Sequence, residues 1–125
     1  MTLLLALPVL MTTLVGNPQF DAAFCKMLTV SAVKTNAEKG SMVDSVTRNE
    51  GMEVSCDKKS VAFKKSLTVH ASQLEAGWLA NAEKRHDEGM CSIEDWAYAV
   101  KTGWSITMPI TTLDGQRFTL ITKCD

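Results

Sequence analysis

The sequence predicts an α+β fold: an N-terminal helix, a three-stranded antiparallel meander, two further helices and a C-terminal β-hairpin. Three observations predict one helix-backed, disulfide-stapled sheet: apolar residues at helical spacing in some segments, strict alternation in others, and four widely spaced cysteines. The length of 125 residues, with 46% apolar and 22% charged residues, fits one domain with a real core. A net charge of -1 offers no basic footprint, so we expect no nucleic-acid partner.

The N-terminal segment resembles a signal peptide. Residues 3–15 are apolar and uncharged, and this run is too short for a spanning helix, which needs about 20 residues. We therefore expect a signal-like segment at 1–16, a domain at 17–125, and a periplasmic or secreted location. No Lys or Arg leads the segment and no small-x-small cleavage site follows it. An uncleaved anchor, which would be the only membrane contact, and a cytosolic chain with an apolar N-terminal element stay open as alternatives.

The first element of the domain is a helix. Asn17 has the character of an N-cap and Pro18 suits the first helical position. Apolar residues recur at spacings of three and four from Phe20 to Leu28, and Gly40 ends the element. The pattern predicts a helix over residues 18–36.

Three strands are expected next. Residues 42–48 form a short mixed strand, and Asn49-Glu50-Gly51 has turn chemistry. Apolar and polar residues alternate over 52–56, and after a turn at 57–59 the apolar face continues over 61–69, with Lys65 as the odd member. Short connections predict that these three strands pair consecutively and antiparallel.

Two helices should follow the strands. Ser72 and Glu75 have the spacing of a capping box, and an apolar stripe that includes Trp78 continues to Ala82, with Gly89 as the stop signal. A shorter helix starts at Ser92 and ends before Gly103.

The C-terminal segment predicts a hairpin. Apolar residues alternate from Trp104 to Ile110, Asp114-Gly115 is a turn signal, and the returning strand covers 118–124. Pro109 has no N–H to donate, so we expect its strand to have an exposed edge there.

The cysteines Cys25, Cys56, Cys91 and Cys124 include no close pair of the kind that zinc or redox sites use. In an exported protein they indicate structural disulfides, and in a cytosolic one they would be buried thiols. Of three possible pairings we prefer Cys25 with Cys56 and Cys91 with Cys124, because each joins a helix to a strand within one half.

Catalytic signals are weak. His86 precedes Asp87 and Glu88, but neighbours on a helix diverge by about 100° and do not converge on one point. His70 follows a strand, and we interpret it as a surface or capping residue. The sequence lacks a nucleophile elbow and a phosphate loop. We therefore expect no enzyme activity, no catalytic residue, no cofactor and no metal.

Binding signals are somewhat better. Trp78 and Trp96 lie on apolar helical stripes, Trp104 opens a strand near the junction of sheet and helices, and Lys64 belongs to a lysine pair beside the third strand. We favour a non-enzymatic module that binds another protein as an inhibitor or accessory factor. The alternative is a carrier of a small apolar ligand near the three tryptophans. A hydrolase that uses His70 or His86 is a third hypothesis.

Overall fold

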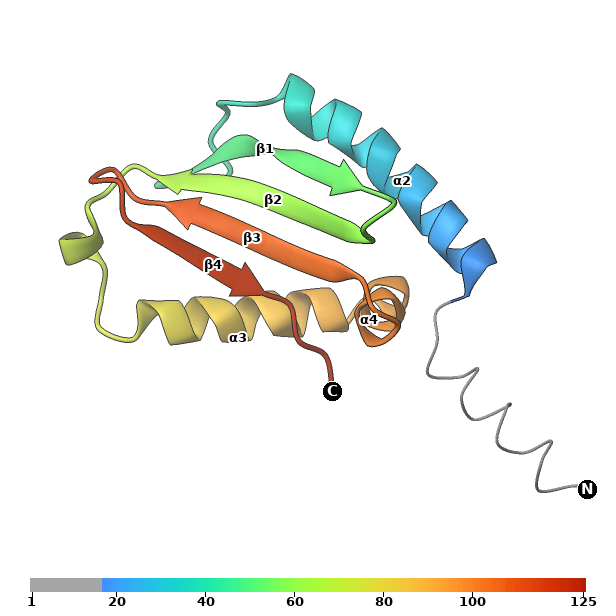
Figure 1. Ribbon diagram of the computed structural model, residues 1–125. Helices are drawn as coiled ribbons and strands as arrows, with labels where there is room; N and C mark the ends of the chain where they lie inside the picture. Colours follow the sequence, from blue (N-terminus) through green and yellow to red (C-terminus); the bar gives the residue numbers. More distant parts are fainter. Residues whose placement is uncertain (1–16) are drawn as a thin grey trace, which may run out of the picture.

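Residues 17–125 are described by a computed structural model, and the signal-like segment 1–16 lies outside the described residues. Four strands lie side by side, with α2 beyond β1, α3 alongside β4, and α4 at the end of the sheet where β3 begins (Figure 1). The elements in chain order are α2 (Pro18–Ala37), β1 (Thr47–Ser55), β2 (Ser60–Leu67), the 3-10 turn η1 (Ala71–Gln73), α3 (Trp78–Cys91), α4 (Glu94–Lys101), β3 (Ser105–Thr111) and β4 (Arg117–Ile121).

The sheet is mixed, which confirms the α+β class but corrects the predicted meander. Its order is β1-β2-β3-β4, with antiparallel outer pairs and a parallel β2–β3 pair. The expected strand at 42–48 does not form: Met42 makes an isolated bridge to Arg48, and only Thr47 and Arg48 of this segment lie in a strand, as the start of β1. Gly51 is a bulge inside β1, where the register shifts, and does not close a turn. The expected third strand is β2, and its parallel partner β3 is reached through the α3–α4 crossover.

Pro109 does not lie on a sheet edge. Its strand, β3, lies between β2 and β4, so the prediction of an exposed edge was wrong. The β2–β3 pairing is interrupted between Ala62–Thr107 and Lys65–Ile110, where the proline has no N–H to offer. An internal strand therefore accepts the proline at the cost of a local gap in the ladder.

The start of α2 agrees with the sequence prediction, whereas the starts of α3 and α4 do not. The Asn17 side chain accepts hydrogen bonds from the N–H groups of Gln19 and Phe20, and α2 begins at Pro18. Ser72 does not cap α3 as expected. The chain becomes extended at Leu74, and Gly77 (φ 80°) precedes the helix, which continues through Gly89 to Cys91. The last helix begins at Glu94, after Ile93 rather than Ser92.

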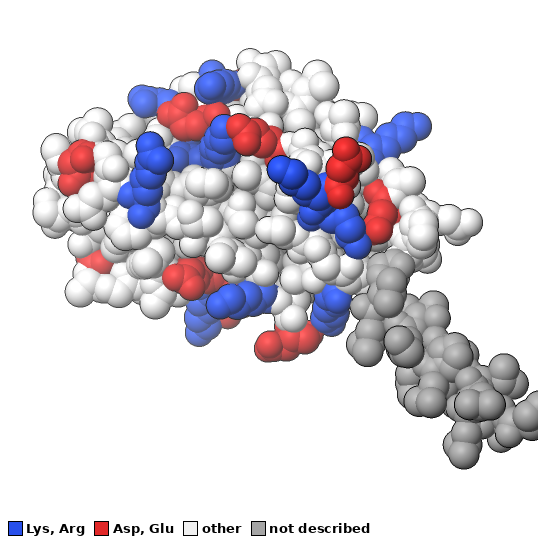
Figure 2. Space-filling model, viewed as in Figure 1, with Lys and Arg blue, Asp and Glu red and all other residues white. Residues whose placement is uncertain are grey.

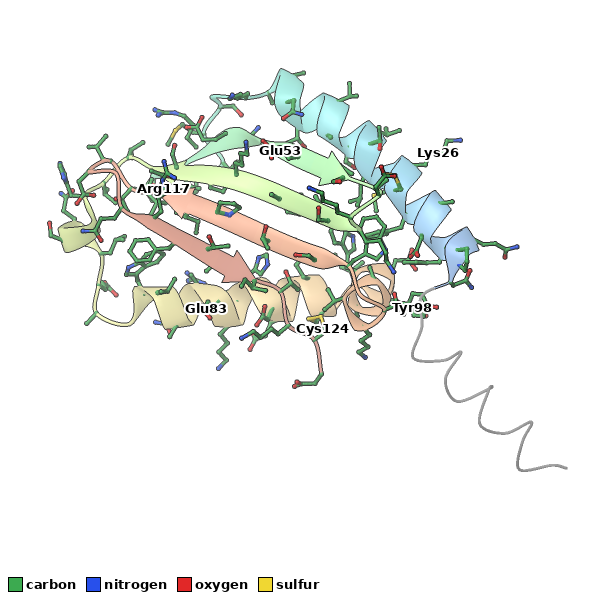
Figure 3. The ribbon with its side chains drawn as sticks, viewed as in Figure 1. Lys26, Glu53, Glu83, Tyr98, Arg117 and Cys124 are labelled. Atoms are coloured by element: carbon green, nitrogen blue, oxygen red, sulfur yellow. A yellow bond between two sulfur atoms is a disulfide. The ribbon has the colours of Figure 1, made fainter. Side chains whose placement is uncertain are left out.

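One face of the sheet packs against the helices and forms two core clusters. The larger lies under α2 and α4 and includes Leu28, Val61 and Ile106, which are almost fully buried. The smaller lies under α3 and contains Leu67, Ile110 and Leu120. The opposite face carries polar strand residues such as Glu53 and Arg117 (labelled in Figure 3). In Figure 2 charged groups of both signs surround an uncharged centre, without a large patch of one sign.

Two disulfides join Cys25 to Cys56 and Cys91 to Cys124, which is the pairing that the sequence favoured. The first connects α2 to the turn after β1. The second connects the end of α3 to the residues after β4, and Cys124 lies beside the C-terminal half of α3 in Figure 3. Each bridge therefore fastens a helix to the sheet, and both lie at the end of the sheet where β2 and β3 begin.

A partly buried set of polar contacts, here called the clasp, holds α2 on β1. The Asn36 side-chain amide donates to the Met52 carbonyl (3.0 Å) and accepts from the Met52 N–H (2.8 Å), as a neighbouring strand would. The Asn49 side chain also donates to the Thr35 carbonyl at 2.8 Å. Gly51 makes this approach possible, because a Cβ built there would lie 2.8 Å from Asn36 Oδ1. The clasp satisfies backbone groups on the outer edge of β1, which would otherwise be open to pairing.

Candidate functional site

The candidate site is a groove of about 630 Å³ on the helix-bearing side of the sheet, at the end away from the disulfides. Its floor comes from β2, β3 and β4, one wall from the loop before β1, and the other from η1 and α3. The lining residues are Val43, Asp44, Val46, Thr47, Lys65, Leu67, Gln73, Leu74, Glu75, Trp78, Ala82, Arg85, His86, Met108, Ile110 and Leu120.

The loop wall exposes apolar side chains. Val43 is 54% exposed and Val46 is 37% exposed, although the loop itself is well tied down. Asp44 Oδ1 accepts the N–H groups of Val46 (2.9 Å) and Thr47 (2.7 Å), and these bonds lower the pKa of the Asp44 carboxyl. The Val46 carbonyl also accepts the N–H of Thr68, after β2. A fixed loop that presents valines to solvent is typical of a surface that another molecule covers.

The opposite wall is built around Trp78. Its ring meets Phe118 of β4 edge-to-face, with 5.2 Å between ring centroids. The connection that leads to this wall is anchored to the hairpin turn, because the Ala71 N–H donates to Asp114 Oδ1 at 3.0 Å. The Asp114 pKa is lowered by its hydrogen bonds with the Thr112 hydroxyl and the Ala71 N–H. The aromatic wall is thus held in place from both strand and turn.

The floor is apolar except for one cation. Lys65 lies among Leu67, Met108 and Ile110, and burial lowers the pKa of its ammonium group. Within residues 17–125 the ion pairs are Lys59–Asp21 and Lys64–Glu53, so Lys65 has no acidic partner there. A cation without a counter-ion on an apolar floor is the most unusual feature of the groove.

His86 lies at the side of the groove near β4. Its Nε2 is 2.6 Å from the Thr122 hydroxyl, and burial lowers its pKa despite the opposing charge of Asp87. Asp87 itself accepts the Lys123 N–H at 3.2 Å. The histidine is half-buried because its ring packs against Thr122, just after β4, and α3 continues beyond it to Cys91. Local pattern alone therefore placed this residue on a solvated helix end.

The tryptophans named from the sequence do not share one pocket. Trp78 lines the groove, whereas Trp96 and Trp104 pack on Phe24 in the other core cluster, at centroid distances of 5.1 and 5.0 Å. Trp104 also donates from Nε1 to Asp21, which pairs with Lys59. Lys64 lies one residue from Lys65, on the opposite face, where it pairs with Glu53. His70 is exposed, and its N–H donates to Gln73 Oε1.

Sequence reasoning missed most of the groove. Its loop wall was expected to be a strand, and its floor is assembled from strands distant in sequence. Two signals are present in the sequence: valines at 43 and 46 in a polar segment, and Lys65 in an apolar row. The sequence shows that Lys65 interrupts an apolar row, but the order of the strands in the sheet is needed to see that this row lines a groove.

Residues 17–125 offer no group of three or more His, Cys, Asp and Glu side chains arranged to hold a metal ion. Within the same range, none of the helices has both the length and the apolar character that crossing a membrane requires.

The burial of His86 predicts a loss of stability in mild acid. Its folded pKa lies below the unfolded value of about 6.5, so its contribution is complete above that pH and is lost as the pH falls through the folded pKa. The thermal midpoint of the oxidised protein should begin to fall as the pH drops below about 6.5, and this loss should be complete once the pH is below the folded pKa of His86. His86→Gln should flatten the profile between those limits, and His70→Gln should leave it unchanged. Parallel profiles for wild type and His86→Gln would contradict the assignment.

Comparison with known proteins shows similarity in fold. No family model and no curated protein matches the sequence. A Pseudomonas aeruginosa protein described as secreted is 17% identical, with a TM-score of 0.59 over 83% of this chain and 92% of that one. The pilotin EpsS of the Vibrio vulnificus type 2 secretion system is 11% identical, with a TM-score of 0.59 over 86% of this chain and 94% of that one. At these identities, what this chain shares with the two proteins is their small α+β fold.

Proposed function

We propose that this chain is a non-enzymatic, exported accessory protein that holds an apolar segment of a partner protein in the groove. The observation that carries the proposal is the pair of exposed valines on a fixed wall, which line one groove with Trp78 and with a floor that is apolar except for Lys65. Binding sites between proteins concentrate aromatic and aliphatic anchors in such hollows.

An exported location is supported by two disulfides and by a fold shared with a secreted protein and a pilotin. The pilotin also supports the idea of a protein partner, because it is itself part of a secretion system. We infer that the present chain serves an envelope assembly of a similar kind.

The absence of enzymatic activity remains part of the proposal. The His86 ring is hydrogen-bonded to the Thr122 hydroxyl, and the Asp87 carboxylate accepts the Lys123 N–H. The two side chains therefore do not point together at one position where a substrate could bind. A general acid–base pair needs both groups within reach of one reacting atom. His70 is exposed and comes before η1 in the chain, whereas His86 lies on α3, which follows η1.

Photo-crosslinking in the cells that make the protein tests the groove. A photoreactive amino acid at Val46 should give a discrete protein adduct, and mass spectrometry of the adduct should identify a partner segment with regularly spaced apolar residues. The same probe at Val30, which is 66% exposed on α2, is the matched control and should give no such adduct. Adding Val43→Glu should abolish the Val46 adduct. Equal labelling from both positions, or no protein adduct at Val46, would refute the proposal.

A small apolar ligand is the second candidate, because about 630 Å³ lies within the usual size range of ligand sites, roughly 300–1,000 Å³. Trp78 offers a local readout, since the other two tryptophans lie in the separate core cluster. Hydrophobic probes that change the fluorescence of the wild type, but not of Trp78→Phe, would favour this candidate. A response that is unaltered in Trp78→Phe would exclude the groove as its source.

A further inference from the structure

Lys65 interrupts an otherwise apolar row. On β2 it shares the helix-facing side with Val61, Phe63 and Leu67, and across the sheet it lies in register with Ile110. Lys65 lines the groove together with Leu67, Met108 and Ile110, and burial lowers the pKa of its ammonium group. A leucine at this position would make the floor wholly apolar and would bury more apolar surface than the lysine does.

The acids nearest the groove are not partners of Lys65. Asp44 is engaged by the Val46 and Thr47 N–H groups, and Glu75 lies exposed at the rim without an ion pair. Lys64, the next residue along the strand, has its counter-ion in Glu53 on the other face. Of these two adjacent lysines, only Lys65 lines the groove and has no ion pair within residues 17–125. Arg85 also lines the groove, but it is an exposed residue of the α3 wall and does not belong to the floor.

The floor of the groove indicates which backbone shape it receives. It is formed by β2, β3 and β4, and the floor residues of β2 and β3 already have strand neighbours on both sides. The third floor strand, β4, is an edge strand, but α3 runs alongside it (Figure 1), so an extended peptide lying there would find no open edge with which to pair. A helix satisfies its own backbone hydrogen bonds and presents an apolar stripe, so it suits a groove of this kind.

The charge of Lys65 then restricts that stripe. A wholly apolar helix would remove water from the ammonium group and leave it unpaired, which is costly in a low-dielectric site. A helix with a carboxylate facing Lys65 would give the buried ammonium group a counter-ion. Such charge complementarity contributes to the specificity of binding more than to its affinity.

We propose that Lys65 is the specificity-determining residue of the groove, and that it selects a partner helix with one Asp or Glu within its apolar stripe. This inference rests on the proposed function and adds the chemistry of the partner.

A displayed library of amphipathic helical peptides tests it. The library varies four stripe positions among apolar and acidic residues on a fixed polar face. It is selected against the oxidised wild type, Lys65→Met and Lys64→Met, where the last variant alters the opposite face. Wild type and Lys64→Met should enrich peptides with one acid at a constant stripe position. Lys65→Met should enrich wholly apolar stripes.

Fluorescence anisotropy on one enriched peptide and its Glu→Gln counterpart completes the test. Wild type should prefer the Glu form by about tenfold or more, and Lys65→Met should lose or invert the preference. If peptides bind all three proteins with the same stripe and no Glu preference, the Lys65 inference fails while the groove function stands. If no protein enriches any peptide, or if dodecanoate alone occupies the groove, the proposed function itself fails.

Discussion

Removal of the Cys25–Cys56 bridge by Cys25→Ala with Cys56→Ala is expected to lower the free energy of unfolding by about 3–4 kcal/mol. The bridge closes a loop with a sequence separation of 31, and its loss enlarges the unfolded ensemble. It also frees the half of α2 that carries Phe24 and Leu28 into the main core. Guanidinium chloride unfolding of the wild type and the double variant, both under oxidising conditions, measures the difference.

The Cys91–Cys124 bridge is the matched control, because its separation of 33 gives nearly the same loop term. Cys91→Ala with Cys124→Ala should therefore cost a similar amount, and reduction of the wild type should approach the sum of the two losses. A double variant at Cys25 and Cys56 as stable as the oxidised wild type would contradict the structural role of that bridge.

Gly51→Ala should be the most damaging single glycine substitution, at about 3 kcal/mol. At φ 107° any side chain is strained, by about 1–3 kcal/mol. The new methyl group would also displace Asn36 from the Met52 backbone, whose buried groups would cost about 1–3 kcal/mol when left unpaired. Thermal or denaturant unfolding provides the measurement.

Gly40→Ala separates the two effects. Gly40 has a similar φ of 95°, but no atom lies within 4 Å of the place that a new methyl group would take, so only strain should contribute. A cycle with Asn36→Ala sharpens the test, because that change should add little once Gly51→Ala has opened the clasp. Equal losses for the two glycine variants, or fully additive losses for the pair at 36 and 51, would show that the clasp does not stabilise the fold.

The parts of the fold that sequence reasoning predicted well depend on neighbouring residues. Asn17 and Pro18 define the start of α2, and Asp114-Gly115 marks the β3–β4 hairpin, because caps and turns act over a few residues. The cysteine pairing could be predicted for a different reason: although the paired cysteines are 31 and 33 residues apart, each bridge joins a helix to the sheet within one half of the chain.

The errors arise where distant contacts override local preference. In place of a strand at 42–48 the chain forms a turn in which Asp44 binds backbone N–H groups, and Ser72 loses its expected capping role because the chain extends at Leu74. The central place of Pro109 follows from a parallel pairing across the whole α3–α4 crossover, which no local pattern encodes. The groove depends on that pairing, so its position was beyond sequence reasoning even though Lys65 was visible.

The placement of both disulfides at one end of the sheet separates the covalent bridges from the groove. The loop 43–47 and the first turn of α3 lie at the other end and are held by non-covalent contacts, among them the hydrogen bonds of Asp44 and Asp114. Neither bridge lines the groove. The redox state of the surroundings should therefore act on the stability of the fold more than on the shape of the groove.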